Sequence, residues 1–192
     1  MLAVPKVSEE HLEARRAQIL KGARGVFARY GYNGATVARL EEATGLSRGA
    51  IFHYFDDKED LFLALGVDAN RRYVEAVTAG GFAEAIREIA DESPELLAVF
   101  RELEMRLSQD EGFRRRIAQS TAEQRDTLEA WFQGQRMSGE MRRDIEWDDL
   151  VRFAGIVVNG LALRIAGGYE TNVDTVVRLL DDALRPPPEP SG

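Results

Sequence analysis

The chain has 192 residues, no cysteine and a formal net charge of −8. This length suits one compact protein with two small parts, and the lack of cysteine excludes a disulfide framework and any metal site built on thiolates. The opening MLAVPKVSEEHL has no signal-peptide apolar core, and the longest apolar run, residues 153–163, is too short to span a bilayer. We therefore expect a cytoplasmic protein that does not enter the membrane.

The charge is distributed unevenly along the chain. Residues 1–55 hold eight Lys and Arg against five Glu, a net charge of +3, whereas residues 56–192 carry −11. A positive segment on an acidic chain indicates a polyanionic partner such as DNA. Helices that each carry their own solvated face would give the same numbers, so charge alone does not decide the matter.

Residues 8–30 predict a first long helix. Ser8 can cap it, an apolar stripe runs from Leu12 to Tyr30, and Gly31 ends it.

The segment 36–55, TVARLEEATGLSRGAIFHYF, predicts two short helices joined by a tight turn. Thr36 and Ser47 stand where their hydroxyls can cap the two helices, and Gly45 stands where the chain leaves the first helix in a left-handed conformation. A helix-turn-helix places its second helix in the major groove of DNA. The spacing fits an ordinary helical hairpin equally well, and the flanking residues favour DNA binding.

Candidate DNA contacts cluster at the start of the second helix. Arg48 can donate two hydrogen bonds to guanine O6 and N7, or it can bind a phosphate. Thr36 and Ser47 can combine capping with phosphate binding, because free amides point outward at helix N-termini. Gly49 has no side chain and permits close approach to the sugar-phosphate backbone.

Downstream of residue 57, hydrophobic periodicity predicts six helices. They are expected at 58–78, 82–91, 95–108, 111–136, 147–166 and 173–185, with breaks at 80–81 and 91–94, a loop at 137–140 and a disordered tail.

The predicted helix 147–166 is apolar nearly all round, so it must be buried on more than one side. Together with the last helix it suits a two-fold, four-helix interface between two copies of the chain, and a large monomer core is the alternative. The expected interface residues are Phe153, Val157, Leu161, Ile165, Val177 and Leu180.

Residues 19–65 resemble the TetR family of bacterial transcriptional regulators. Phe27, Gly31-Tyr32, Ser47-Arg48-Gly49, Tyr54-Phe55 and Lys58-Glu59 all stand at the family's spacings. Within the family, the segments RLEEATGLSRGAIFHYF and PKVSEEHLEARRAQIL are most similar to repressors of aconitase expression in actinobacteria.

This resemblance implies an all-α fold of about nine helices. Residues 1–57 would form an arm and a three-helix DNA-binding domain, residues 58–185 a helical effector-binding and dimerisation domain, and residues 186–192 the tail. The protein would be a homodimeric repressor of a palindromic operator on double-stranded DNA, released by a small-molecule effector. Tyr54 and Lys58 match positions that hold phosphates. Independently of the resemblance, Phe52 could meet a thymine methyl or pack on a neighbouring helix, and His53 could reach a base or phosphate or be an ordinary surface residue. The full set of expected DNA contacts is Thr36, Ser47, Arg48, Gly49, Phe52, His53, Tyr54 and Lys58.

By the same analogy, an effector pocket would lie among the helices at 95–108, 111–136 and 147–166. Its candidate lining residues, most of which would serve equally well as core, are Phe100, Glu104, Leu107, Arg125, Leu128, Trp131, Phe132 and Asn159. The arginines at 101, 106, 125 and 164 would suit a carboxylate effector through bidentate pairing, or they would pair with Glu on solvated helix faces.

Two other classes of protein compete with this interpretation. An enzyme is disfavoured because the two histidines, His11 and His53, are isolated and no phosphate loop or metal-ligand spacing occurs, so we expect no cofactor and no catalytic residue. The second class is a regulator without an effector, controlled by its abundance or by a protein partner. A cavity of several hundred Å3 with converging polar groups would favour ligand control instead.

Overall fold

A computed structural model describes residues 9–187 of the chain, and every regular element in that range is a helix. In chain order they are α1 (Glu9–Gly34), α2 (Val37–Thr44), α3 (Arg48–Ile51), α4 (Lys58–Ala90), α5 (Pro94–Gln109), α6 (Glu111–Ser120), α7 (Ala122–Ser138), α8 (Trp147–Ala166) and α9 (Val173–Leu184). The predicted all-α class is confirmed. Between residues 9 and 187, no helix is long and apolar enough to cross a membrane.

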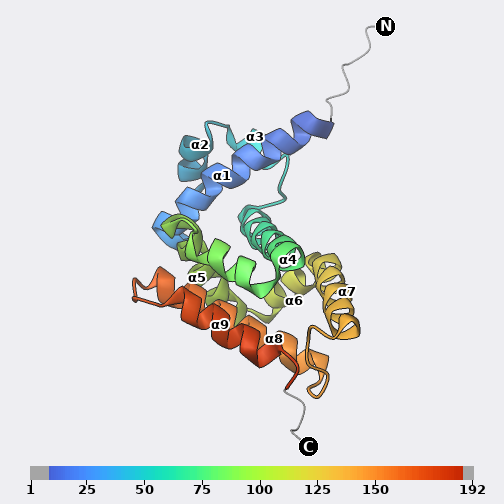
Figure 1. The fold of residues 1–192 in the computed structure, drawn as a ribbon. Helices are drawn as coiled ribbons and strands as arrows, with labels where there is room; N and C mark the ends of the chain where they lie inside the picture. Colours follow the sequence, from blue (N-terminus) through green and yellow to red (C-terminus); the bar gives the residue numbers. More distant parts are fainter. Residues whose placement is uncertain (1–8, 188–192) are drawn as a thin grey trace, which may run out of the picture.

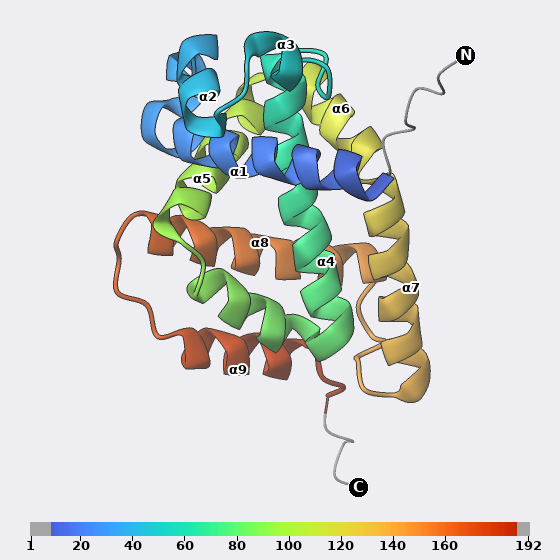
Figure 2. The ribbon, with the colours of Figure 1, turned by 90° about the horizontal axis from the view of Figure 1, so that it is seen from above.

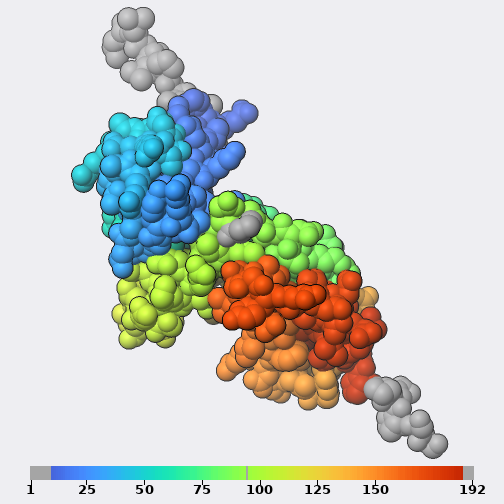
Figure 3. All heavy atoms as spheres, turned by 90° about the vertical axis from the view of Figure 1, so that its left-hand side faces the viewer, coloured from blue at the N-terminus to red at the C-terminus, as the bar shows by residue number. Residues whose placement is uncertain are grey.

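Helices α1, α2 and α3 gather at one end of the molecule, and α8 and α9 lie toward the other end (Figure 1). The long helix α4 runs between the two ends, as the turned view makes clear (Figure 2). In the space-filling view the α1–α3 end, in blue, lies against the green side chains of α5 (Figure 3).

Two hydrophobic cores hold these parts together. The first includes α1–α3 and the start of α4, and it also takes in side chains of α5 and α6. Within it Phe62 of α4 packs against Phe27 of α1 and Phe113 of α6, with ring centroids 4.8 and 5.9 Å apart. The second core lies among the end of α4, α7, α8 and α9. Helices α1–α3 therefore share one core with the helices that follow the expected boundary at residue 57.

Helix α1 is broken near its end, at Gly31, which has a left-handed φ of 65°. A Cβ atom there would lie 3.3 Å from the carboxylate of Glu102 on α5. That carboxylate accepts a hydrogen bond from the backbone N–H of Tyr32 at 2.9 Å. A residue of α5 thus satisfies a donor that the break in α1 exposes.

The helix boundaries agree with the sequence pattern in most places. The break expected at 80–81 is confirmed at Gly81, whose non-helical φ of 75° kinks the run Lys58–Ala90 that is labelled α4. The helix expected at 111–136 is wrong, because the chain bends at Thr121 between α6 and α7. Neither Gly nor Pro marks this bend, and the Thr121 hydroxyl donates to the carbonyl of Ile117 at 2.9 Å. Ser8 and the tail residues 188–192 lie outside the described residues.

Candidate DNA-binding surface and ligand pocket

Local hydrogen bonds fix the helix-turn-helix. The Thr36 hydroxyl accepts from the N–H of Arg39 and the Ser47 hydroxyl accepts from the N–H of Ala50, both at 3.4 Å. Gly45 ends α2 with a φ of 69°. The predicted caps and turn are confirmed, although the second helix is regular only over Arg48–Ile51 and continues as turns.

Most of the expected DNA contacts are open to solvent. Thr36, Ser47, Arg48, Gly49 and His53 are exposed. The Arg48 guanidinium makes no hydrogen bond or ion pair within residues 9–187, while its backbone N–H donates to Glu41 at 2.6 Å. This arrangement leaves a free cation at the start of α3.

Phe52 and Tyr54 are half-buried instead. Both pack against the first core, and the Tyr54 ring meets the His53 ring edge-on at 5.3 Å between centroids. This position supports the packing alternative for Phe52, and it leaves only part of each ring accessible.

Lys58 is engaged by the protein itself. Its ammonium donates to the carbonyl of Tyr32 at 2.8 Å and lies 4.4 Å from the centre of the Tyr32 ring. Burial, and then the nearby Arg106 guanidinium, lower the pKa of Lys58. A phosphate would have to compete with these contacts, so the structure supplies Lys58 with a structural role that the sequence did not indicate.

An ion-pair network surrounds Lys58 and joins three helices. Glu59 of α4 pairs with Arg106 of α5 and with Arg116 of α6. The Arg106 guanidinium also lies over the Tyr32 ring, 4.2 Å from its centre. With the Glu102 contact to Tyr32, this network ties the end of α1 and the start of α4 to α5.

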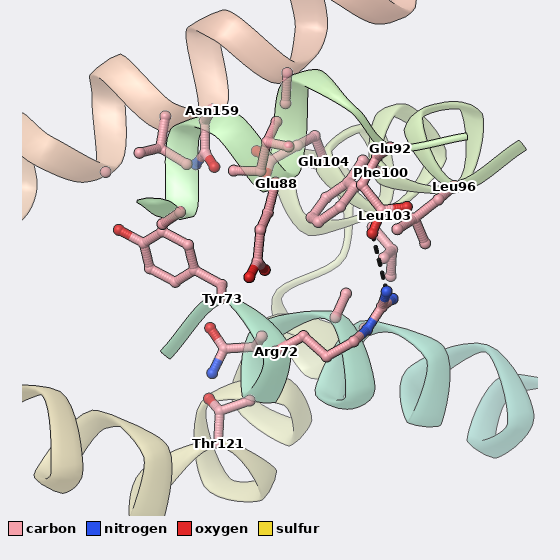
Figure 4. Close-up of a pocket in the computed structure, with 18 of the residues that line it drawn as sticks. Arg72, Tyr73, Glu88, Glu92, Leu96, Phe100, Leu103, Glu104, Thr121 and Asn159 are labelled. Atoms are coloured by element: carbon pink, nitrogen blue, oxygen red, sulfur yellow. Dashed lines mark hydrogen bonds and ion pairs between the residues drawn. The ribbon is translucent and has the colours of Figure 1, made fainter. Parts of the chain in front are cut away.

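A cavity of about 300 Å3 lies on the opposite side of α5. Side chains from α4, α5 and α8 line most of it (Figure 4). Four of the expected lining residues do contribute, namely Phe100, Glu104, Leu107 and Asn159.

The other four expected lining residues do not reach this cavity. Leu128 and Phe132 are buried in the second core, Trp131 packs against that core, and Arg125 is exposed on α7. The inner face of α7 is used for packing against α4, which is why its aromatic residues are core rather than pocket.

Helix α4 also lines the cavity, although the sequence pattern did not indicate it, and its polar residues there include Asn70, Arg72, Tyr73 and Glu88. The Arg72 guanidinium pairs with Glu92 at 3.0 Å and lies 3.5 Å from Asp68. Burial raises the pKa of the Tyr73 hydroxyl. The sequence signal that could have predicted this contribution is the run of polar residues that interrupts an otherwise buried helix.

None of the four arginines expected near a carboxylate effector lines the cavity. Arg106 belongs to the network on the other face of α5, and Arg164 lies over the Tyr169 ring at 5.3 Å. Arg101 and Arg125 are exposed.

The expected dimer residues divide into two groups. Phe153 is exposed, and Val157 and Ile165 are half-buried against the second core. Leu161, Val177 and Leu180 are 3, 6 and 2% exposed, so these three are corrected to core residues of the single chain. Helix α8 has two apolar faces, and apart from Phe153 the α8 residues chosen from the sequence lie toward the inner one. The outer face carries Phe153 together with Ile156 and Leu163.

Comparison with known proteins extends the similarity over nearly the whole chain. The family of bacterial regulatory proteins described as the tetR family matches residues 19–65. The HTH-type transcriptional repressor Rv1474c of Mycobacterium tuberculosis is 38% identical over 95% of this chain and 99% of its own length. The HTH-type transcriptional repressor AcnR of Corynebacterium diphtheriae is 40% identical, over 95% and 97% of the two chains.

Solved structures agree on the fold. Salmonella enterica GusR superposes with a TM-score of 0.71 at 19% identity, covering 93% of this chain and 98% of its own. A putative TetR-family transcriptional regulator from Rhodococcus sp. superposes with a TM-score of 0.71 at 21% identity, covering 89% of this chain and 96% of its own. It is the two relatives, each at least 38% identical over 95% of this chain, that show the family: the chain belongs to the TetR family of bacterial regulatory proteins and is a helix-turn-helix transcriptional repressor rather than an enzyme.

Proposed function

We propose that the protein represses transcription as a cytoplasmic homodimer bound to a palindromic operator, and that a small molecule in the cavity beside α5 releases it. The observation that carries the DNA-binding part is the free Arg48 guanidinium at the start of an exposed, capped helix. A guanidinium in that place can reach guanine O6 and N7 in the major groove.

Gly49 supports the same placement of α3. A Cβ atom at this position would meet nothing within 4 Å in the chain. Internal packing therefore does not require a glycine here, whereas close approach of a DNA backbone does.

The outer face of α8 supports a two-fold dimer. Phe153, Ile156 and Leu163 lie three and seven residues apart and are 41, 66 and 41% exposed, and Leu179 of α9 is 60% exposed. Exposed apolar side chains at helical spacing are the usual mark of an interface. Two copies would place two α3 helices for successive major grooves, roughly 34–36 Å apart.

The cavity favours ligand control over the effector-independent alternative. Its volume of about 300 Å3 and its mixed apolar and polar lining suit a small ligand. The same helix α5 that lines it also contacts Tyr32 and Glu59 through Glu102 and Arg106. A ligand that shifts α5 would therefore shift the elements that hold α1 and the start of α4.

Selection of binding sites from a random DNA pool, near physiological salt, tests the proposal because protein–DNA affinity depends strongly on ionic strength. A palindromic consensus is expected from a dimer. Enrichment of single half-sites would contradict the dimeric part, and no enrichment by the free protein would contradict the DNA-binding part.

A further inference from the structure

The charges that line the cavity do not balance. Three carboxylates, Glu88, Glu92 and Glu104, face one cation, Arg72. Arg72 is already paired with Glu92, and this is the one interaction drawn between the cavity side chains in Figure 4. Glu88 and Glu104 make no hydrogen bond or ion pair with any other described residue. Two carboxylates from different helices are therefore unpartnered at the same cavity.

An anionic ligand is disfavoured by this arrangement. Arg72 is held by Glu92 at 3.0 Å and lies 3.5 Å from Asp68, so its charge is compensated within the protein. A carboxylate ligand would have to displace Glu92 from Arg72. It would also come close to the exposed carboxylate of Glu88 and the half-buried carboxylate of Glu104, and like charges brought together repel each other.

The rest of the lining suits an apolar or aromatic body. Phe100 and Tyr73 present rings at the cavity, and Leu103, Leu107 and Val158 add aliphatic surface. Aromatic rings attract a cation through their electron-rich faces, and the attraction grows as water is excluded. In Figure 4 the Glu88 carboxylate lies among the labelled side chains, near Tyr73.

One further group calls for a ligand atom. The Arg72 Nη2 atom is buried and has no hydrogen-bond partner within the described residues. A buried donor that stays unsatisfied costs free energy, and an acceptor oxygen on the ligand would satisfy it without an added negative charge.

We propose that the effector is a small organic cation with an apolar body, whose ammonium group is held by the carboxylates of Glu88 and Glu104. This inference rests on the proposed function of the cavity as the effector site. Charge-assisted hydrogen bonds from an ammonium to two carboxylates are among the stronger polar contacts in proteins, and here they would also remove the excess negative charge of the cavity.

Three probes of nearly equal size and shape test the charge preference. Phenethylammonium, 2-phenylethanol and 3-phenylpropionate are titrated into the full chain by isothermal titration calorimetry. The cation is expected to bind at least tenfold more tightly than the carboxylate. Equal binding, tighter binding of the carboxylate, or no measurable binding of the cation at millimolar concentration would overturn the inference.

Charge-removing variants locate the binding site. Glu88→Gln and Glu104→Gln keep the side-chain shape, and each is expected to lower the affinity for phenethylammonium about tenfold. Glu95→Gln, an exposed position on α5 that does not line the cavity, is the control and should bind like the unmodified chain. Unchanged binding by both cavity variants would place the cation elsewhere and contradict the proposal.

Failure of the ligand class is distinguishable from failure of the proposed function. The operator selected from the random pool is measured in the same buffer, with and without phenethylammonium. If the protein binds its operator but calorimetry shows no preference for the cation, only the proposed cationic nature of the effector is contradicted. If the cation binds preferentially but no operator is selected from the pool, the proposed DNA-binding function is contradicted, and the preference of the cavity for a cation still stands.

Discussion

At the scale of single residues, Arg48 carries the sharpest expectation. Arg48→Ala should reduce affinity for the selected operator by about 1–3 kcal/mol and relax the choice of base at one position of each half-site, because a bidentate contact to guanine discriminates by that amount. Fluorescence anisotropy with the operator and its single-base variants measures both effects.

The matched control is Arg115→Ala, an exposed arginine of α6 in an i,i+4 pair with Glu111. It should leave the operator preference unchanged. If Arg48→Ala lowers affinity uniformly for every sequence, Arg48 contacts a phosphate and does not contact a base.

Lys58 provides a second test, because its structural contacts and a phosphate contact predict different results. Lys58→Met removes the hydrogen bond to the Tyr32 carbonyl, and we expect the free energy of unfolding in urea to fall by about 1 kcal/mol. A phosphate contact would instead reduce the slope of log affinity against log salt concentration by about one, with stability unchanged.

Residue roles could be predicted from the sequence where the partner is close in the chain. Thr36 and Ser47 bond to amides three residues away, so their capping followed from the local pattern. Lys58 meets a carbonyl 26 residues away and Glu102 meets an amide 70 residues away. No local spacing encodes such contacts, and they emerge only when the first core assembles.

At the scale of the helices, the crossing of α1 and α2 depends on one glycine. A Cβ atom at Gly22 would lie 2.8 Å from the Thr44 Cγ2 atom and 3.0 Å from the Ala43 carbonyl. Gly22→Ala should therefore lower the free energy of unfolding by about 1–3 kcal/mol, as overpacking does, and weaken operator binding by moving α2.

Gly25, three residues along the same helix, is the matched control. It has nothing within 4 Å of a Cβ position, so Gly25→Ala should raise the free energy of unfolding by roughly 0.5–1 kcal/mol through helix propensity alone. Chemical denaturation of both variants compares them directly. Equal effects of the two substitutions would mean that α1 and α2 do not pack as closely as described.

Helix positions followed from periodicity, whereas two features of the helices did not. The bend at Thr121 lacks the Gly or Pro that usually marks a break. Helix α8 presents apolar residues on two faces, and periodicity alone cannot say which face meets the protein's own core. Burial decided that question, placing Leu161 inside and Ile156 outside.

At the scale of the whole molecule, the outer face of α8 determines the expected assembly. Ile156→Glu should give a folded monomer with poor operator affinity, since it places a charge at the centre of the proposed interface. Sedimentation velocity and circular dichroism separate assembly from folding. Met137→Glu, at a residue that is 81% exposed on α7, is the control and should remain dimeric.

Leu161→Glu should behave differently from both. Because Leu161 is buried in the second core, an unpaired carboxylate there should unfold the chain rather than merely separate two copies. A folded, monomeric Leu161→Glu variant would contradict the assignment of that face to the core.

The two-sided use of α5 has a consequence for how such a repressor would sense its signal. If a ligand at the cavity weakens operator binding by some factor through α5, operator DNA must weaken ligand binding by the same factor, because the two equilibria are thermodynamically linked. Repressor molecules free in solution would then capture the signal at lower concentrations than those seated on DNA. The concentration at which a gene responds would depend on how many repressor molecules the cell holds in excess of its operators.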